Sequence, residues 1–358
     1  MKRLIIGCFF VGVLVSWLVW GQPMRYLRVV SAFPEQSNVQ AEQQPRSNTP
    51  GPIPNPAPVV SSFERTHVID PDRIWEYLEA LVGERDQEQD RAWVRDYLAN
   101  QLEKFGLMTT FQSFEGGVNL IAQSAQSETS AVTDQTHILV AAHYDTVFNS
   151  PGADDNASGL AVLLELARLF GSESTSNRLE LVFFDREEDG LLGSLAFTSQ
   201  AENLKNLTAA IVLDMVGYAC YVEGCQTYPS GLNVDPFLQR AGIQNPRQGE
   251  FLAVVGELEN RALLERFQAR EQNRKTLPVV LVPVPLKGVL TPDVLRSDHA
   301  AFWYQQIPAV LVTDTANLRS PHYHQPSDTL ANLDRDFLIQ SAQFITDVVS
   351  QLLMDKSF

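Results

Sequence analysis

Apolar residues recur along the chain with two different periods, and each period predicts a kind of element. Asp70 and Pro71 are a typical helix start, which predicts a helix that runs to about Leu81. A helix with one apolar face is expected from Trp93 to Phe105, because apolar residues recur there every three or four positions before Gly106. Two edge strands are expected to follow, at about 107–113 and 117–123.

Four later apolar runs are short and continuous, which is typical of strands buried on both faces. They cover residues 137–142, 179–184, 210–213 and 308–312. Helical segments alternate with them, including a nearly all-apolar helix at 157–170 and a C-terminal helix at about 334–353. This alternation predicts an α/β fold, a doubly wound, mostly parallel central sheet flanked by helices, in a single domain over residues 63–358.

The ends of these four runs carry acidic or histidine side chains. The residues are His143 and Asp145 after the first run, Asp155 in the loop that follows, Glu187 and Glu188 after the second, Asp214 after the third and His324 beyond the fourth. In open α/β sheets, ligand sites form at the carboxyl ends of the strands. We therefore expect these side chains to converge although they lie far apart in sequence.

This set of side chains matches the needs of a hydrolytic site with two metal ions. Two divalent ions roughly 3.5–4 Å apart require a bridging carboxylate, further ligands on each ion, and a free carboxylate that takes a proton from water. Glu187 would be that base, and Asp145 is placed to accept the second N–H of the His143 ring. The ligands would be His143, Asp155, Glu188, Asp214 and His324.

Six motifs in this region resemble those of the M28 zinc peptidases, a family that includes secreted bacterial aminopeptidases. They are HxD at 143–145, GADDNASG at 152–159, EExGLxGS at 187–194, LDM at 213–215, SDHAAFW at 297–303 and YHxxxDT at 323–329. Any one of them is a weak signal, but all six occur in the order and spacing of the family. The resemblance covers residues 68 to 355.

The resemblance also implies a role for each residue of the site. Asp155, and not Asp154, would bridge the two ions. His143 and Asp214 would complete one ion, Glu188 and His324 would complete the other, and Glu187 would be the general base. The resemblance favours His324 over His322, because the family's YHxxxDT motif falls on His324. Of the remaining candidates, Asp298 and His299 would support the site from behind, and His67 and His137 are expected to be structural.

The activity implied is that of an aminopeptidase with two Zn²⁺ ions, acting on peptides with a free N-terminus. Imidazole ligands favour zinc over magnesium. Two alternatives stay open: a glutaminyl cyclase-like acyltransferase with one zinc, and a catalytically inactive binding ectodomain. The complete ligand set argues against both. Two departures from the family pattern leave substrate preference open. They are Arg186 before the glutamate pair and the lack of the cysteines that some relatives carry before SDH. Loops at about 218–232 and 284–296 are expected to line the substrate pocket.

Composition excludes one class of partner. The formal net charge is −16, whereas a nucleic-acid-binding protein is expected to carry a basic surface. The hydrophobic share of 44% is enough for a substantial core.

The N-terminal part of the chain is expected to lie outside the enzyme. Lys2 and Arg3 precede an apolar run over residues 4–20, which predicts an anchor or signal peptide within 1–33 and an exported domain. The lack of a small-residue cleavage motif favours an uncleaved anchor at the outer or periplasmic face. Residues 34–62 are rich in Pro, Gln and Ser, which predicts a disordered linker.

The exported part holds two cysteines, Cys220 and Cys225, in a loop after Asp214. An oxidising compartment would favour a short disulfide between them. Two free thiols or two zinc ligands are the alternatives, and the second is weaker because the carboxylate and histidine set is already complete.

Overall fold

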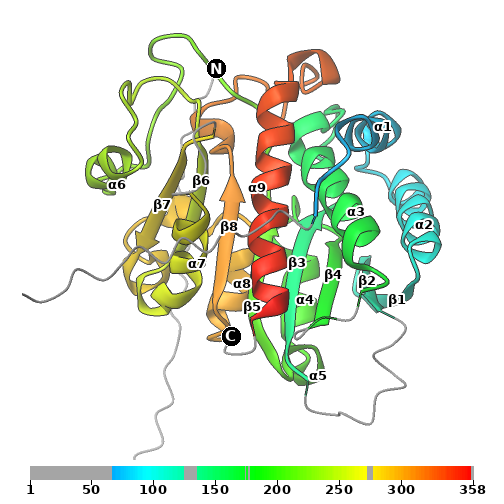
Figure 1. Ribbon diagram of the computed structural model, residues 1–358. Helices are drawn as coiled ribbons and strands as arrows, with labels where there is room; N and C mark the ends of the chain where they lie inside the picture. The colour runs from blue at the N-terminus through cyan, green and yellow to red at the C-terminus, as the bar shows by residue number, and fades with distance from the viewer. Residues whose placement is uncertain (1–66, 125–134, 174, 176–177, 272–276, 356–358) are drawn as a thin grey trace, which may run out of the picture. The chain divides into compact units, whose positions relative to one another are not determined.

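The core of the fold is one mixed sheet in the order β1-β2-β4-β3-β5-β8-β6-β7 (Figure 1). The computed structural model describes residues 67–124, 135–173, 175, 178–271 and 277–355, all within one unit, Ser62–Phe358. The predicted anchor at 1–33 and linker at 34–62 lie outside the described residues. The strands are β1 Leu107–Phe114, β2 Gly117–Ser124, β3 His137–His143, β4 Arg178–Phe184, β5 Leu207–Leu213, β6 Leu252–Glu257, β7 Val279–Val284 and β8 Ala309–Thr313.

The centre of the sheet is parallel, as the continuous apolar runs predict. β4, β3, β5 and β8 are parallel neighbours. At one side, β1 and β2 form an antiparallel hairpin, and β2 pairs antiparallel with β4. At the other side, β6 runs antiparallel to β8 and parallel to β7. The prediction of a doubly wound, mostly parallel sheet is confirmed.

Helices cover both faces of the sheet. Alternate residues of each strand point to opposite faces, so neighbouring residues of one strand belong to different core clusters. Val140 belongs to a core cluster that includes residues of α1, α2, α3, α7 and α9, whereas Ala141 belongs to a second cluster that includes residues of α4, α6 and α8. The helices are α1 Pro71–Leu81, α2 Glu88–Lys104, α3 Gly159–Phe170, α4 Leu192–Thr198, α5 Ala201–Leu204, α6 Asp235–Arg240, α7 Arg261–Glu271, α8 His299–Tyr304 and α9 Arg335–Met354. Short helical turns are η2 Ala153–Ser158, η3 Leu258–Asn260, η4 Pro285–Gly288, η5 Pro292–Leu295, η6 Ala316–Leu318 and η7 Leu330–Asn332.

Two predicted helices differ slightly from the structure. The predicted helix at 157–170 begins at Gly159, because the torsion angles of Asp155 and Asn156 are not helical and set η2 apart as a separate turn. α9 begins after Asp334, whose carboxylate caps it by accepting a hydrogen bond from the N–H of Phe337. Among the described helices, α9 alone is long and apolar enough to cross a membrane, and 67% of its apolar stretch is buried inside the protein.

Candidate metal centre

Neighbouring strands bring the predicted residues to one edge of the sheet. His143 is the last residue of β3, and Asp214 directly follows β5. The turn η2 carries Asp155 between β3 and α3. Glu188 follows β4, and His324 lies beyond β8. Because β4, β3, β5 and β8 are adjacent and parallel, their carboxyl ends meet at this edge.

Asp155 lies between two groups of potential metal ligands. One of its oxygens, Oδ1, is 3.2 Å from His143 Nε2, and that nitrogen is 3.8 Å from Asp214 Oδ1. The other oxygen, Oδ2, is 3.3 Å from His324 Nε2, which is 3.0 Å from Glu188 Oε2. Within each group, the ligand atoms all lie within 4.8 Å of one another. The five side chains therefore form two clusters that share one carboxylate, as the sequence predicts.

Several ligand atoms in these clusters are buried without a hydrogen-bond partner. They are Asp155 Oδ2, Glu188 Oε1 and His324 Nε2. A buried polar atom without a partner is costly, and bound cations are one way in which proteins satisfy such atoms. The mixture of imidazole and carboxylate donors is one that zinc accepts. The residues present therefore fit a pair of zinc ions.

The electrostatics of the clusters also fit a cation. Burial lowers the pKa of His324, but Asp155 and Glu188 outweigh burial and raise this pKa to about 9. Burial and the negative charge of Asp155 raise the pKa of Glu188 to about 7. These carboxylates therefore stabilise positive charge at this edge of the sheet, and divalent cations would supply that charge.

Asp145 connects the histidine of one cluster to the glutamate pair. Its Oδ1 lies 3.4 Å from His143 Nδ1, and its backbone oxygen lies 3.2 Å from the same nitrogen. Its carboxylate also accepts hydrogen bonds from the backbone N–H groups of Glu187 and Glu188, each at 3.1 Å. Asp145 is therefore a positioning residue for both strand ends, which extends the role expected from its place after His143.

Glu187 is buried beside the ligands without being part of the shared-carboxylate clusters. Its side chain is 7% exposed and lies with His143 and Glu188 in a third close group. Burial, and next the charges of Asp298 and Asp214, raise the pKa of Glu187 well above its ordinary value, although His143 opposes them. A buried carboxyl that holds a proton readily, next to the metal ligands, has the properties of a general base and acid.

The neighbouring histidines take the places expected of them. His322 Nδ1 is 2.9 Å from Ser327 Oγ, outside both clusters, so the geometry favours His324. His299 is fully buried, with Nε2 at 2.9 Å from the Val294 carbonyl, and burial lowers its pKa to about 4. The other two are far from the clusters in the fold: His67 contacts Ser350 and Glu173, and His137 begins β3 at the opposite end from His143.

Asp298 and Arg186 are the two further residues considered near the glutamate pair. Asp298 is fully buried, and burial raises its pKa to about 7. Its charge is one of those that raise the pKa of Glu187. The side chain of Arg186 pairs with Asp189 at 2.7 Å and donates to the carbonyl of Gly116.

Two residues that support the metal centre were not predicted from the sequence. Asp328 accepts hydrogen bonds from the backbone N–H groups of Asp154 and Asp155, at 2.9 and 3.1 Å, and so holds the shared carboxylate's backbone. Its position in the YHxxxDT motif was the available signal. Arg85 is 1% exposed and donates to backbone carbonyls that include Tyr144 and Gly152. No pattern in the sequence pointed to Arg85.

A pocket with about 990 Å³ of free space, part of it open to solvent, extends from the clusters. At one end it is lined by Asp155, Glu187, Glu188 and Asp214. Its other wall is apolar and comes from Leu232, Val234, Leu238, Phe251, Ala253, Val255, Val280, Val282, Val294 and Leu311. The loops expected at 218–232 and 284–296 contribute, but strands β6, β7 and β8 supply much of the wall, which loop position alone did not indicate.

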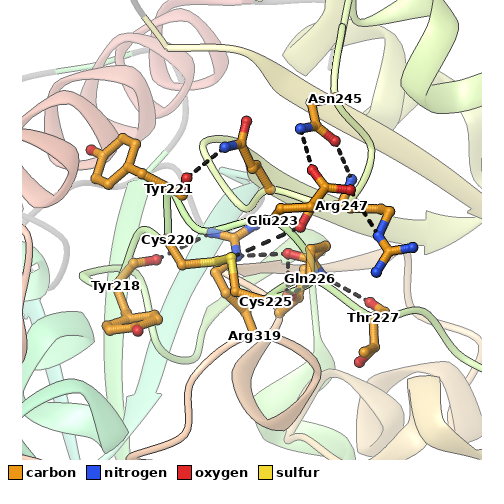
Figure 2. Close-up of a disulfide and its surroundings, with 12 residues drawn as sticks. Tyr218, Cys220, Tyr221, Glu223, Cys225, Gln226, Thr227, Asn245, Arg247 and Arg319 are labelled. Atoms are coloured by element: carbon orange, nitrogen blue, oxygen red, sulfur yellow. Dashed lines mark hydrogen bonds and ion pairs between the residues drawn. A yellow bond between two sulfur atoms is a disulfide. The ribbon is translucent and has the colours of Figure 1, made fainter.

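The disulfide between Cys220 and Cys225 is present, as predicted (Figure 2). The next residue, Gln226, lines the pocket and accepts a hydrogen bond of 2.8 Å from Arg319 Nε. Arg319 also donates to the carbonyls of Tyr218 and Phe251, at 3.2 and 2.8 Å. The crosslinked loop is thereby tied to the pocket wall through one buried guanidinium.

Comparison with known proteins gives a family match and several relatives. The model of peptidase family M28 matches residues 119–242 and 269–349, more than half of the chain. The uncharacterized protein YfbL of Escherichia coli is 32% identical over 232 residues, which are 61% of this chain and 67% of that protein. The probable lipoprotein aminopeptidase LpqL of Mycobacterium tuberculosis is 29% identical over 244 residues, which are 65% of this chain but only 44% of the relative.

Solved structures share the fold at low sequence identity. The LapA aminopeptidase of Legionella pneumophila superposes with a TM-score of 0.63 at 19% identity, over 80% of this chain and 73% of that chain. A glutaminyl cyclase of Porphyromonas gingivalis superposes with a TM-score of 0.57 at 20% identity, over 79% of this chain and 99% of that chain. These likenesses establish the fold, and they are shared by proteins with different reactions.

Proposed function

The chain belongs to peptidase family M28, and from this premise we propose that it is a zinc-dependent aminopeptidase that removes N-terminal residues from peptides. The observation that carries the proposal is the position of Asp155, whose two oxygens face two separate ligand groups. The aminopeptidase relative LpqL supports the activity.

Two zinc ions would be held by this arrangement. His143, Asp155 and Asp214 would hold one ion, and Asp155, Glu188 and His324 would hold the other. Family membership supports zinc as the metal, and the number of ions is our inference from the two clusters. When bound, zinc supplies Lewis acidity, which polarises a carbonyl and makes water more acidic.

The protein's own groups would handle the proton in the reaction. Glu187 accepts the proton that water loses as its oxygen forms a bond to the scissile carbonyl carbon, and it then gives the proton to the nitrogen that leaves. The carboxylate of Asp145 holds Glu187 in place by accepting a hydrogen bond from the backbone N–H of Glu187, and it also orients the His143 ring. The deep burial of Glu187 protects this transfer from bulk water.

The shape and charge of the pocket support action at an N-terminus. The carboxylates at the clusters offer hydrogen-bond acceptors to the α-amino group of a peptide. The apolar wall beyond them would take the side chain of the first residue, and its lining of Val, Leu and Phe side chains favours a large apolar side chain there. A charged first side chain would lose its hydration without gaining a partner.

The glutaminyl cyclase reading is less well supported, although the fold is shared with such an enzyme. A cyclase with one zinc would not need the second cluster, and here both clusters are complete. The inactive-ectodomain reading has even less support, because neither a ligand nor the base is missing.

We also propose that the domain works outside the cytoplasm, held to a membrane by residues 4–20. The apolar run itself and the lipoprotein relative support this location. Cys8 lies inside the apolar run instead of after it, so an apolar span explains anchoring better than lipidation does. The partners of this enzyme would be peptides with a free N-terminus, and the net charge of −16 argues against nucleic acid.

A panel of fluorogenic aminoacyl amides, assayed with and without a zinc chelator, tests the proposed activity. We expect hydrolysis of substrates with leucine or phenylalanine, loss of activity on chelation and its return with added zinc. Cyclisation of N-terminal glutamine as the main reaction would replace the proposal with the cyclase reading.

A further inference from the structure

Arg296 lines the same pocket as the carboxylates of Asp155, Glu187, Glu188, Asp214 and Asp293. It follows η5 and precedes the SDH motif, and its side chain is exposed to solvent. Among the described residues that line the pocket, Arg296 is the one basic side chain. Arg296 is thus the side chain of this lining that suits an anionic group of a substrate.

The guanidinium of Arg296 contacts only neutral acceptors within the described part of the chain. Nη1 donates to Asn317 Oδ1 at 3.3 Å, and Nη2 donates to the hydroxyl of Tyr323 at 3.1 Å. The described residues place no carboxylate within 4 Å of it, whereas Arg186, which precedes the glutamate pair, is paired with Asp189. A guanidinium has five N–H donors in a planar fork, so donors remain for a ligand.

Tyr323 connects Arg296 to the metal ligands. The Tyr323 ring stacks on the His324 ring with 3.7 Å between centroids, and the guanidinium carbon lies 5.8 Å from the Tyr323 centroid. Tyr323 therefore links the guanidinium to His324, one of the proposed ligands, so Arg296 belongs to the same site as the clusters.

The chemistry of the pocket lining indicates which part of a peptide Arg296 would meet. In the proposed function the apolar wall encloses the first side chain, which leaves the exposed Arg296 for the part of the peptide beyond the scissile bond. A leaving part that carries a carboxylate would meet, in Arg296, the one basic side chain among the described residues of the lining. Arginine binds carboxylates through two parallel hydrogen bonds, which suits this geometry.

We propose that Arg296 binds a carboxylate on the leaving part of the substrate, which makes short, acid-bearing peptides the preferred substrates. This inference rests on the proposed aminopeptidase function. The carboxylate has two possible sources, the C-terminus of a dipeptide and the side chain of an acidic second residue. Both present the same chemistry to the guanidinium.

Matched pairs of substrates test the role of Arg296. One pair is Leu-Gly and Leu-Gly-amide, which differ in the terminal carboxylate, and the other is Leu-Asp-amide and Leu-Asn-amide, which differ in the side chain. In the wild-type protein, we expect kcat/KM for the acid to exceed that for its neutral partner about tenfold, or about 1.4 kcal/mol, in at least one pair. The pair that shows the difference identifies the source.

Two variants separate carboxylate binding from support of Tyr323. Arg296→Gln should bring the acid-to-neutral ratio close to one, mainly by loss on the acid, and Arg296→Lys should retain part of the ratio. If Arg296 only positioned Tyr323, all four substrates would slow by the same factor and the ratio would persist. That result, or a wild-type ratio near one in both pairs, would overturn the proposal.

Calorimetric binding of Leu-Gly and Leu-Gly-amide to the zinc-loaded Glu187→Gln protein separates this inference from the proposed function. Hydrolysis without discrimination in either pair would leave the aminopeptidase proposal standing and remove the role of Arg296. Tighter binding of Leu-Gly that Arg296→Gln abolishes, without hydrolysis by the wild-type protein, would keep the carboxylate site and reject the activity. Equal binding of the two ligands, together with equal turnover, would contradict the carboxylate site.

Discussion

His324 Nε2 lies 3.3 Å from Asp155 Oδ2, although His324 follows the strand β8 and Asp155 follows the strand β3. The other oxygen of Asp155 faces His143 at 3.2 Å. The carboxylate of Asp155 thus contacts segments from distant parts of the chain, and the proposed chemistry depends on these contacts.

The adjacent glutamates should respond differently to the same substitution. Glu187→Gln should keep both zinc ions and the fold but reduce kcat, because general acid–base catalysis contributes on the order of 10²–10⁴ in rate. Glu188→Gln should lose zinc more readily, since an amide oxygen is a poorer ligand than a carboxylate. Zinc content and steady-state kinetics of both variants are the measurements. Loss of zinc from the Glu187 variant but not from the Glu188 variant would reverse the assignment.

Asp145→Asn should weaken zinc binding without removing a ligand. The amide offers a single acceptor oxygen, so one of the N–H groups of Glu187 and Glu188 would lose its partner, and the His143 ring would be less firmly held. Changes in such outer positions typically cost 10–100-fold in metal affinity or activity. Competition with a chelator of known affinity gives the zinc dissociation constants. An unchanged constant with unchanged kcat would show that Asp145 has no positioning role.

Opposite changes of pocket size should move substrate preference in opposite directions. Ala253→Leu would fill part of the apolar wall and lower the ratio of kcat/KM for leucyl over alanyl substrates. Val255→Ala would enlarge the pocket and raise the ratio of kcat/KM for phenylalanyl over leucyl substrates. A methylene in such a pocket is worth roughly 10–200-fold in discrimination. Equal effects of each variant on all substrates would place the first side chain elsewhere.

Removing the disulfide should lower stability and disturb the pocket. The double change Cys220→Ser and Cys225→Ser frees a short loop, for which chain entropy predicts a loss of about 2 kcal/mol. KM for leucyl substrates should rise, because Gln226 directly follows the crosslink and lines the wall. Urea unfolding and kinetics measure the two effects. Gln226→Ala is the control, since it changes the wall but leaves the crosslink intact.

The buried imidazole of His299 predicts how stability depends on pH. Burial lowers its pKa to about 4 in the folded protein, compared with about 6.5 when unfolded. The contribution of neutral His299 to the free energy of unfolding is therefore fully present above pH 6.5. This contribution falls by about 1.4 kcal/mol per pH unit as the pH falls toward 4. In metal-free protein, the stability advantage of the wild type over His299→Gln should shrink over this range. A constant difference would mean that His299 is not held neutral by burial.

Periodicity and strand ends predicted most of the fold and the candidate ligands. The continuous apolar runs indicated buried parallel strands, and the carboxyl end of each gave a ligand position, as at His143 and Asp214. The wall of the pocket was less accessible to this reasoning. Val280 and Val282 look like ordinary core residues in sequence, and their place in the pocket lining comes from the position of β7 beside β6 in the sheet.

Long-range hydrogen bonds were the part that sequence could not supply. Asp328 supports the backbone of Asp155, and the motif that contains it does not indicate this contact. Arg85 satisfies carbonyls from two loops, and no periodic or local pattern points to it. Arg296 was likewise indistinguishable from a solvated surface residue. Its significance comes from the pocket that surrounds it and from the neutral partners of its guanidinium.

The zinc content of the purified protein and of its Asp155→Ala variant tests the central claim most directly. A carboxylate shared by two ions predicts two zinc ions per chain in the wild type and the loss of both in the variant. The matched changes Asp214→Ala and Glu188→Ala should each remove mainly one ion, from opposite clusters. A wild-type protein that is fully active with one tightly held ion, or an Asp155→Ala variant that retains two, would contradict the account.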